Sequence, residues 1–435
     1  MSHYKRYPAY KDSGVEWLEQ IPEHWSAKPL CRVVSCNDDS LPDDTLADAP
    51  LRYVDISSVD QTGGIKQVAE MQFGDAPSRA RRKAKDGDVV ISTVRTYLKS
   101  VAPVTPDYAD CVYSTGFAVL RPRAGQVSPE FLKWMMLDDL LVQTVEAHSE
   151  GLSYPAINAT ELVKLKAPIP PPVEQTVIAA ALDRETARID ALIEKKTRFI
   201  ELLKEKRQAL ITHTVTKGLD PNVKMKHSGV EWIGEVPEHW KVCRLGSLYR
   251  EAVRTGDPLL PILSISIHDG ITDDELAPED RDRQIYQIED RTKYKRVRPN
   301  DLAYNMMRAW QGAFGAVAVD GLVSPAYVVA EPAGELRSTY IENLLRTPMA
   351  VEEMRRFSRG IADFRMRLYW EYFRDLHVCV PPLDEQDEIL SDLSWRGARM
   401  EKLGEATERS IALLKERRSA LITAAVTGKI DLACG

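Results

Sequence analysis

Two short segments of this sequence concentrate positive charge that could neutralise the phosphates of a nucleic acid. Residues 79–99 carry seven Lys or Arg residues against two Asp residues, and residues 291–312 carry six against one Asp. Each segment contains an expected strand followed closely by Arg95 or Arg308, with an aromatic residue two positions further on. Clustered cations supply phosphate contacts, and an arginine on a loop can reach base edges in a groove. For one cluster a solvated charged surface is an equally good interpretation, but the recurrence favours binding.

The candidate nucleic-acid-binding residues are chosen by charge and position within these segments. They are Arg79, Arg81, Arg82, Lys83, Lys85, Arg95 and Lys99 in the first segment, and Lys293, Lys295, Arg296, Arg298, Arg308 and Trp310 in the second. A base-reading arginine affects one position of a target, whereas a phosphate-binding lysine affects the affinity for every sequence. We therefore expect Arg95→Ala and Arg308→Ala each to relax one part of the recognised sequence, and Lys83→Ala to weaken binding generally.

The motifs of common catalytic and cofactor sites are missing from the sequence. There is no Gly-x-x-x-x-Gly-Lys-Ser/Thr phosphate loop, no Gly-x-Gly-x-x-Gly after a strand, and no His-Glu-x-x-His. Nor is there the Asn-Pro-Pro or Asp-Pro-Pro followed by an aromatic residue that an amino-methyltransferase needs to hold a flipped base. His24 and His239 stand in repeated Pro-Glu-His-Trp segments without a metal-ligand partner at matching spacing. We expect no catalysis, no metal site and no cofactor in this chain itself.

Composition narrows the class of protein further. The 435 residues are 44% hydrophobic and 28% charged, which is typical of a globular chain of two to three domains. No apolar run approaches the ~20 residues of a membrane span, the N-terminus lacks a secretion signal, and the six cysteines form no Cys-x-x-Cys pair. We therefore expect a cytoplasmic protein. The net charge of −7 does not favour a strongly basic nucleic-acid binder, so the binding interpretation depends on local charge.

The sequence repeats itself once. Residues 13–25, which begin Ser-Gly-Val-Glu-Trp and end Pro-Glu-His-Trp, recur as residues 228–240. A proline-rich segment leads to Glu-Gln at 174–175 and again at 385–386. Such a long period indicates a duplicated pair of domains and not a solenoid, whose units are ~20–50 residues.

Each copy ends in a stretch with the periodicity of a coiled-coil helix. Apolar residues recur at alternating three- and four-residue spacing, with charged residues between them. The expected seam residues are Leu182, Ile189, Leu192, Leu203 and Leu210 in the first copy, and Leu393, Met400, Leu403, Leu414 and Leu421 in the second. Two unrelated surface helices are the alternative, but their matching phase counts against it. A helix over 173–214 is about 60 Å long, and to bury its seam the second helix must run antiparallel to the first.

These patterns predict a mixed α/β protein with an internal pseudo-twofold duplication. Residues 1–170 and 221–380 are expected to form two globular domains, separated by a pair of long antiparallel coiled-coil helices within 171–220 and 381–435. The expected shorter elements are strands at 88–92, 116–120, 259–265 and 326–329 and helices at 129–148 and 339–357.

The repeated motifs, in this order, resemble those of the specificity subunits of type I restriction-modification systems. The resemblance is carried by the Ser-Gly-Val-Glu-Trp…Pro-Glu-His-Trp opening of each half, the Pro-Pro-x-x-Glu-Gln start of each long helix and the closing Leu-Leu-Lys-Glu…Ala-Leu-Ile-Thr…Val-Thr, and it covers essentially the whole chain. It implies two target-recognition domains that read an asymmetric, bipartite target in double-stranded DNA. It also implies two docked methyltransferase subunits and, in the full complex, two motor-nuclease subunits. S-adenosylmethionine, ATP and magnesium would belong to those partners.

Three other interpretations stay open at this point. A coiled-coil interaction scaffold that binds no DNA would explain the helices and the net charge, but not the paired basic segments. A self-contained DNA-modifying enzyme conflicts with the missing motifs. A specificity subunit of another restriction-modification type shares the features discussed above.

Overall fold

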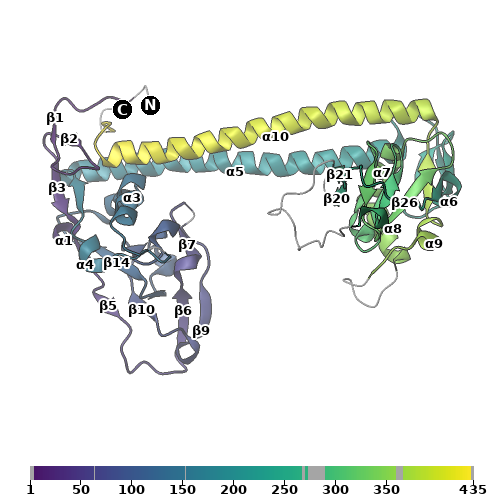
Figure 1. Cartoon of the computed structure of the whole chain (residues 1–435). Helices are drawn as coiled ribbons and strands as arrows, with labels where there is room; N and C mark the ends of the chain where they lie inside the picture. Colours follow the sequence, from purple (N-terminus) through teal and green to yellow (C-terminus); the bar gives the residue numbers. More distant parts are fainter. Residues whose placement is uncertain are drawn as a thin grey trace. The chain divides into compact units, whose positions relative to one another are not determined.

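The computed structural model describes residues 4–62, 64–151, 153–266, 270–272, 290–358 and 366–432. The chain divides into two compact units, Met1–Thr197 with Glu408–Gly435 (unit 1) and Arg198–Thr407 (unit 2). The long helices α5 (Pro172–Lys217) and α10 (Leu383–Val426) each contribute residues to both units (Figure 1). The mixed α/β class and the two long helices predicted from the sequence are therefore confirmed.

The described part of unit 1 is built around two sheets. The first has the order β5 (Asp39–Ser40), β10 (Ala80–Lys83), β13 (Val112–Ser114), β6 (Pro50–Val54) and β9 (Ala69–Gln72), with β13 and β6 parallel. The second has the antiparallel order β12 (Val101–Pro103), β11 (Val89–Ser92), β14 (Phe117–Pro122) and β4 (Val34–Cys36). Three strand pairs complete it, β1 (Tyr10–Asp12) with β2 (Gln20–Pro22), β3 (Ser26–Pro29) with β15 (Lys166–Ile169), and β7 (Val59–Asp60) with β8 (Gly64–Ile65).

Unit 2 repeats the four-stranded sheet and carries shorter strand pairs around it. The sheet has the order β19 (Tyr249–Glu251), β26 (Tyr327–Pro332), β23 (Leu302–Asn305) and β24 (Phe314–Ala316). The pairs are β16 (Met225–His227) with β17 (Glu235–Pro237), β18 (Lys241–Arg244) with β27 (His377–Val380), β20 (Ser264–Ser266) with β21 (Gly270–Thr272), and β22 (Lys295–Val297) with β25 (Gly321–Val323). The strands expected at 88–92, 116–120 and 326–329 are confirmed as β11, β14 and β26.

Short helices cover the sheets of each unit. Unit 1 has α1 (Leu30–Val33), α2 (Pro129–Met136), α3 (Asp139–Ala147) and α4 (Ala159–Leu162). Unit 2 has α6 (Leu245–Leu248), α7 (Ser338–Leu345), α8 (Pro348–Phe357) and α9 (Trp370–Phe373).

Two expected helices are each broken into two, so the sequence prediction was wrong at these points. The helix expected at 129–148 stops before Asp138, whose carboxylate accepts hydrogen bonds from the backbone N–H groups of Leu140 and Leu141 and starts α3. The helix expected at 339–357 stops before Thr347, whose hydroxyl caps α8 ahead of Pro348. Side-chain caps that satisfy free N–H groups compete with continuation of the preceding helix.

The strand expected at 259–265 is also mostly wrong. Only Ser264 and Ile265 of that stretch belong to a strand, β20. Pro261 has no amide hydrogen to donate to a ladder, and Leu259 is 92% exposed, so this part of the apolar run does not pack as a buried strand.

The apolar faces of the long helices are buried differently along their length. In unit 1, Leu182, Ile189 and Leu421 belong to the main buried cluster, and Arg418 of α10 forms a 2.9 Å ion pair with Asp190 of α5. In unit 2, Leu393 packs against the buried cluster that contains Val215. Four further seam residues are half-buried, namely Leu203, Leu210, Met400 and Leu414. Leu192 and Leu403 are 43% and 46% exposed and lie outside both buried clusters.

Both long helices are followed by a glycine in the left-handed region. Gly218 after α5 has a φ of +79°, and Gly428 after α10 has a φ of +74°. A Cβ atom on Gly428 would lie 2.4 Å from Cδ of Pro22, so this position also requires the absence of a side chain. Each long helix is therefore terminated by the glycine that directly or closely follows it.

Some features are absent from the described part of the chain. Its helices include none that is both long and apolar enough to cross a membrane. It also holds no group of three or more His, Cys, Asp or Glu residues placed to bind a metal ion. The five described cysteines are free thiols, and Cys434 lies outside the described residues.

Candidate nucleic-acid interface

In unit 1 the start of α5 holds the Pro-Glu-His-Trp segment through one carboxylate. Glu174 accepts a 2.9 Å hydrogen bond from Nε1 of the buried Trp25 and lies 2.6 Å from Nε2 of His24. The hydroxyl of Tyr7 donates to the same carboxylate at 3.2 Å. Burial, followed by the charge of Glu174, raises the pKa of Tyr7 above its usual value, so its hydroxyl stays a donor. One acidic residue therefore fastens the N-terminal segment to the long helix.

Unit 2 has the same arrangement at the start of α10. Glu385 accepts a 3.0 Å hydrogen bond from Nε1 of Trp240 and lies 2.7 Å from Nε2 of His239. Trp240 is fully buried. The repeated histidines, for which the sequence offered no metal partner, thus share a carboxylate with the neighbouring tryptophan.

The glutamine that follows each of these carboxylates ties the long helix to a second helix. Oε1 of Gln175 accepts from the backbone N–H of Ser128, directly before α2, at 2.8 Å. Oε1 of Gln386 accepts from the backbone N–H of Arg337, directly before α7, at 2.9 Å. Both side-chain amides donate back to the carbonyl five residues earlier. The Glu-Gln motif therefore has the same positioning role in both units.

Arg79 lies just before β10 and is held by two residues of unit 1. Its Nη2 lies 2.8 Å and its Nε 3.1 Å from Oδ2 of Asp55, and Nε also donates to the hydroxyl of Tyr53 at 3.1 Å. Burial opposes ionisation of Asp55, but hydrogen bonds from Tyr53, Ser57 and Arg79 outweigh it and lower the pKa of its carboxyl. The hydrogen bonds that Arg79 donates to Tyr53 and Asp55 raise the pKa of Arg79. The guanidinium is charged and fixed in orientation.

Arg79 lines a pocket of about 330 Å³ that also involves the turn after β11. Arg95 and Lys99, at the two ends of this turn, both have positive φ, +51° and +49°. The Arg95 guanidinium stacks on Tyr154, 5.0 Å from the ring centre. Tyr97, which lies between Arg95 and Lys99 in the sequence, is 46% exposed. Non-glycine residues in the left-handed region are uncommon and often mark functional sites. We call Arg95–Lys99 the Arg95 turn.

The other candidates of the first segment lie on β10 and the loop after it. Arg81 stacks on Phe73 at 4.9 Å from the ring centre. Lys83 is exposed, and Arg82 is half-buried. Lys85 lies 3.3 Å from Oδ2 of Asp39. Of these four, Lys83 and Lys85 are the most accessible to a phosphate.

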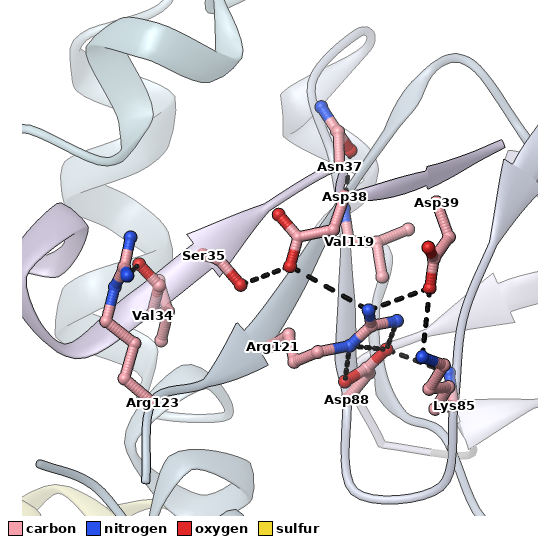
Figure 2. A network of polar contacts seen from close by, with 10 residues as sticks. All are labelled: Val34, Ser35, Asn37, Asp38, Asp39, Lys85, Asp88, Val119, Arg121 and Arg123. Carbon is pink, nitrogen blue, oxygen red and sulfur yellow. Dashed lines mark hydrogen bonds and ion pairs between the residues drawn. The ribbon is translucent and has the colours of Figure 1, made fainter.

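A network of charges lies beside β14 (Figure 2). Arg121 bonds Asp88 through Nε and Nη2, the latter at 2.9 Å, and reaches Asp39 through Nη1 at 2.8 Å. Asp88 is 1% exposed and also accepts from the backbone N–H of Lys85 at 2.8 Å. This network holds the loop that carries the basic residues against the four-stranded sheet.

The candidates of the second segment divide between engaged and accessible side chains. Lys295 donates to the carbonyl of Tyr327 at 2.7 Å, and Arg296 lies 2.9 Å from Asp320. Lys293 and Arg298 are exposed. Lys293 also lies 3.9 Å from Oδ2 of Asp290, so three of these four cations have a partner within unit 2.

Arg308 and Trp310 follow β23 at the position that the Arg95 turn takes after β11. Trp310 is half-buried, donates from Nε1 to the carbonyl of Met307 at 2.9 Å, and lies 5.8 Å from the Arg355 guanidinium. Arg308 is exposed. This turn therefore presents its arginine while it folds its aromatic side chain back onto unit 2.

Sequence reasoning missed the residues that orient these arginines. Tyr53 and Asp55 precede Arg79 by more than twenty positions, and Tyr154 follows Arg95 by more than fifty. No local pattern connects them. Asp55 and Ser57 fit a side-chain cap, a signal that indicates a turn but not an arginine partner.

The comparisons with known proteins point to one class. No family model matches the chain. It is 24% identical over 246 residues to the putative type I restriction enzyme MjaX specificity subunit of Methanocaldococcus jannaschii, covering 55% of this chain and 56% of that relative. It is 22% identical over 303 residues to the type I restriction enzyme EcoBI specificity subunit of Escherichia coli, covering 66% of this chain and 63% of that relative. The matches thus span less than two thirds of these relatives.

Solved structures show the same fold over nearly the whole chain. A chain from a structure of the assembly and conformational transition of a type I restriction-modification system covers 93% of this chain with a TM-score of 0.68 and 22% identity. The HsdS subunit from Thermoanaerobacter tengcongensis covers 94% with a TM-score of 0.54 and 22% identity. The fold is that of type I restriction-modification specificity subunits. The resemblance inferred from the sequence is confirmed, because the curated relatives are such subunits as well.

Proposed function

We propose that this protein is the DNA sequence-recognition subunit of a type I restriction-modification complex. The observation that carries the proposal is a fold shared with an HsdS subunit over 94% of the chain, in a protein whose curated relatives are specificity subunits. The basic residues beside β10 and β22 supply the phosphate contacts that DNA binding requires.

Each unit reads one half-site of double-stranded DNA in this proposal. The scaffold contacts of Glu174 and Glu385 are alike, whereas the turns that carry Arg95 and Arg308 differ. Different turns on like scaffolds predict two different half-sites, and therefore an asymmetric bipartite target. The domain limits predicted from the sequence, 1–170 and 221–380 for recognition and 171–220 and 381–435 for the helices, belong to this proposal.

The duplication and the antiparallel helix pair are part of the same proposal. In unit 1 the end of α10 shares a buried cluster with the start of α5, and in unit 2 the start of α10 packs with the end of α5. This reciprocal packing supports an antiparallel pair. Equivalent scaffolds would give two methyltransferase subunits equivalent docking surfaces, with two motor-nuclease subunits in the full complex.

The chain itself performs no catalysis in this proposal. S-adenosylmethionine, ATP and magnesium belong to the partner subunits, and the complex works in the cytoplasm. The net charge of −7 favours a second candidate, a coiled-coil scaffold without sequence-specific DNA binding. DNA affinity that does not change with salt concentration would support that candidate, because phosphate contacts release counterions. A role in another restriction-modification type is a variant of the first proposal.

The test is the adenine methylome of the host with and without this gene. Loss of one bipartite, asymmetric motif on deletion is the expected result, and it would identify both half-sites. An unchanged methylome, in a host where the chain and a methyltransferase co-purify, would contradict the proposal. As a biochemical control, the purified complex should methylate this motif in vitro. Methylation of the motif should be lost when this chain is omitted.

A further inference from the structure

We propose that Arg79 reads the acceptor edge of a guanine in the half-site recognised by unit 1, and that Asp55 and Tyr53 are its positioning residues. The inference rests on the proposed function and deepens it, because it names one base and the residues that select it. It is carried by the geometry of three side chains and by the pocket beside them.

Asp55 and Tyr53 occupy one edge of the guanidinium and leave the other available. A guanidinium is planar and carries five N–H groups. Nε and Nη2 of Arg79 point to Asp55, at 3.1 and 2.8 Å, and Tyr53 closes the triad through its 2.9 Å hydrogen bond to Asp55. The opposite edge, made by Nη1 and the second N–H of Nη2, therefore points away from this pair. Nη1 has no partner within the described residues, and the side chain is 57% exposed.

An edge with two parallel N–H donors matches two acceptors in one plane. In the major groove, guanine alone presents this pattern through O6 and N7, and arginine is its most common partner. An arginine whose orientation is already fixed loses little side-chain entropy on binding and rejects acceptors placed elsewhere. A flexible cation that only neutralises phosphate needs no such fixation.

The pocket next to Arg79 gives a base pair room to approach. Its lining joins Arg79 and Asp55 to Ser114, Gly116 and the Arg95 turn. A Cβ atom on Gly116 would lie 2.4 Å from Cδ1 of Ile56 and 3.0 Å from Cγ2 of Val94, so a larger residue here would displace side chains of the pocket wall.

The Arg95 turn supplies the flanking contacts. Val94 and Leu98, which line the pocket, are 37% and 40% exposed and therefore accessible to a bound base pair. The left-handed backbone at Arg95 and Lys99 costs free energy that the fold must offset. A rigid turn with exposed apolar and basic side chains suits the apolar edge and the phosphates of a groove.

The arginine–aspartate pair by itself does not make a site. Arg52 and Asp110 form a 2.6 Å ion pair on the same unit, and neither lines the pocket. In unit 2, Arg296 and Asp320 form a pair that also uses Nε and Nη2. Arg79 differs from Arg52 by its position at the pocket beside a strained turn, and Arg52 is for that reason a matched control.

The test uses the full chain in complex with its methyltransferase, on duplexes in which each base pair of the methylated motif is changed in turn. Arg79→Lys keeps the charge but cannot form the two parallel hydrogen bonds. We expect about a ten- to hundredfold loss of preference for one G·C pair, with unchanged affinity for unrelated DNA. Asp55→Asn, which retains an acceptor for the cap of Ser57, should give a smaller loss at the same base pair. Arg52→Lys and Asp110→Asn should change no position.

Three outcomes would overturn the inference. Full discrimination at every position in both Arg79→Lys and Asp55→Asn would exclude base reading by Arg79. In an additional Arg79→Ala variant, which removes the charge, an equal loss of affinity for all sequences, with a salt dependence reduced by about one counterion, would assign Arg79 to a phosphate. A wild-type complex without any sequence preference would remove the proposed function and this inference with it. Thermal unfolding of each variant shows whether the fold is retained.

Discussion

Unit 1 and unit 2 hold their long helices in the same way but arrange their charges in opposite ways. Asp88 and Asp301 are both buried, and each accepts a 2.8 Å hydrogen bond from the backbone N–H three residues before it. In unit 1 the arginine that neutralises this aspartate lies on β14, at position 121. In unit 2 it is Arg254, which follows β19 and bonds both Asp301 and Glu331 of β26.

The strand register shows that equivalent positions of the two networks carry opposite charges. Arg121 on β14 pairs across the sheet with Ser35 of β4, and Glu331 on β26 pairs with Arg250 of β19. The same strand position therefore carries a cation in unit 1 and an anion in unit 2. The residue of opposite charge follows the neighbouring strand in each unit. It is Asp39 after β4 in unit 1 and Arg254 after β19 in unit 2. The buried aspartate of each unit therefore needs one arginine, while the strand that provides this arginine is free to vary.

The largest effect is expected when one charge of the Asp88–Arg121 ion pair is reversed. Arg121→Glu leaves Asp88 buried without its cation and adds a carboxylate next to Asp39. Removing one partner of a buried ion pair costs about 3–5 kcal/mol, so unit 1 should unfold far more easily. Adding Asp39→Arg to this variant recreates the unit 2 arrangement and should restore most of the loss. Hydrogen exchange of β11 and β14 in increasing urea measures both effects within unit 1.

The reciprocal change in unit 2 is the control for this prediction. Glu331→Arg places a second cation beside Arg254, and the added Arg254→Asp should compensate it. If the double variants are no more stable than the single ones in either unit, the two networks are not equivalent and the comparison fails.

A second prediction tests the shared scaffold. Glu174→Ala and Glu385→Ala each leave a buried tryptophan Nε1–H without an acceptor, which costs about 1–3 kcal/mol. The loss should be larger for Glu174, because this carboxylate also accepts from Tyr7. Denaturant unfolding followed by tryptophan fluorescence measures both. Glu23→Ala, an exposed residue of the same segment, is the matched control and should change stability by less than about 0.5 kcal/mol.

The scaffold was predictable from the sequence, whereas the recognition surface was predictable only in its charge. Helix α5 begins and ends within a few residues of the expected 173–214, because seam periodicity, prolines and Gly218 are local signals. The same signals failed at Asp138 and Thr347, where a side-chain cap starts a new helix inside an apolar stretch. The Arg79–Asp55 contact joins β10 to the residue after β6, and no spacing rule predicts a contact that depends on sheet order. The assignment of the thirteen basic-segment residues to DNA binding stays a prediction.

A third prediction uses a difference between the units at the helix break. Asp138 caps α3 in unit 1 and contacts Thr423 of α10, whereas Thr347 caps α8 in unit 2. Burial raises the pKa of Asp138, so this residue favours the folded state most when it is protonated. Its contribution is therefore present below the unfolded pKa of about 3.9 and is lost as the pH rises through the folded pKa.

Asp138→Asn should consequently gain stability relative to the wild type as the pH rises from 4 to 7. Asn caps a helix about as well as Asp, so the change of cap itself costs at most a few tenths of a kcal/mol. Thermal unfolding across this pH range measures the difference. Thr347→Ser is the control and should show a difference that does not vary with pH. A constant offset for Asp138→Asn as well would contradict the raised pKa.

The smallest expected effect separates the aromatic residues of the two turns. Tyr97 is 46% exposed, so Tyr97→Ala should change stability by less than about 0.5 kcal/mol. Trp310→Ala removes the hydrogen bond to Met307 and the stacking with Arg355, and should cost about 1 kcal/mol. For binding to the target duplex the order should reverse, because only Tyr97 is presented outward. Thermal unfolding and DNA titration of both variants decide the point. If the two variants lose the same stability and the same DNA affinity, the two turns have the same function and the units differ in their charges alone.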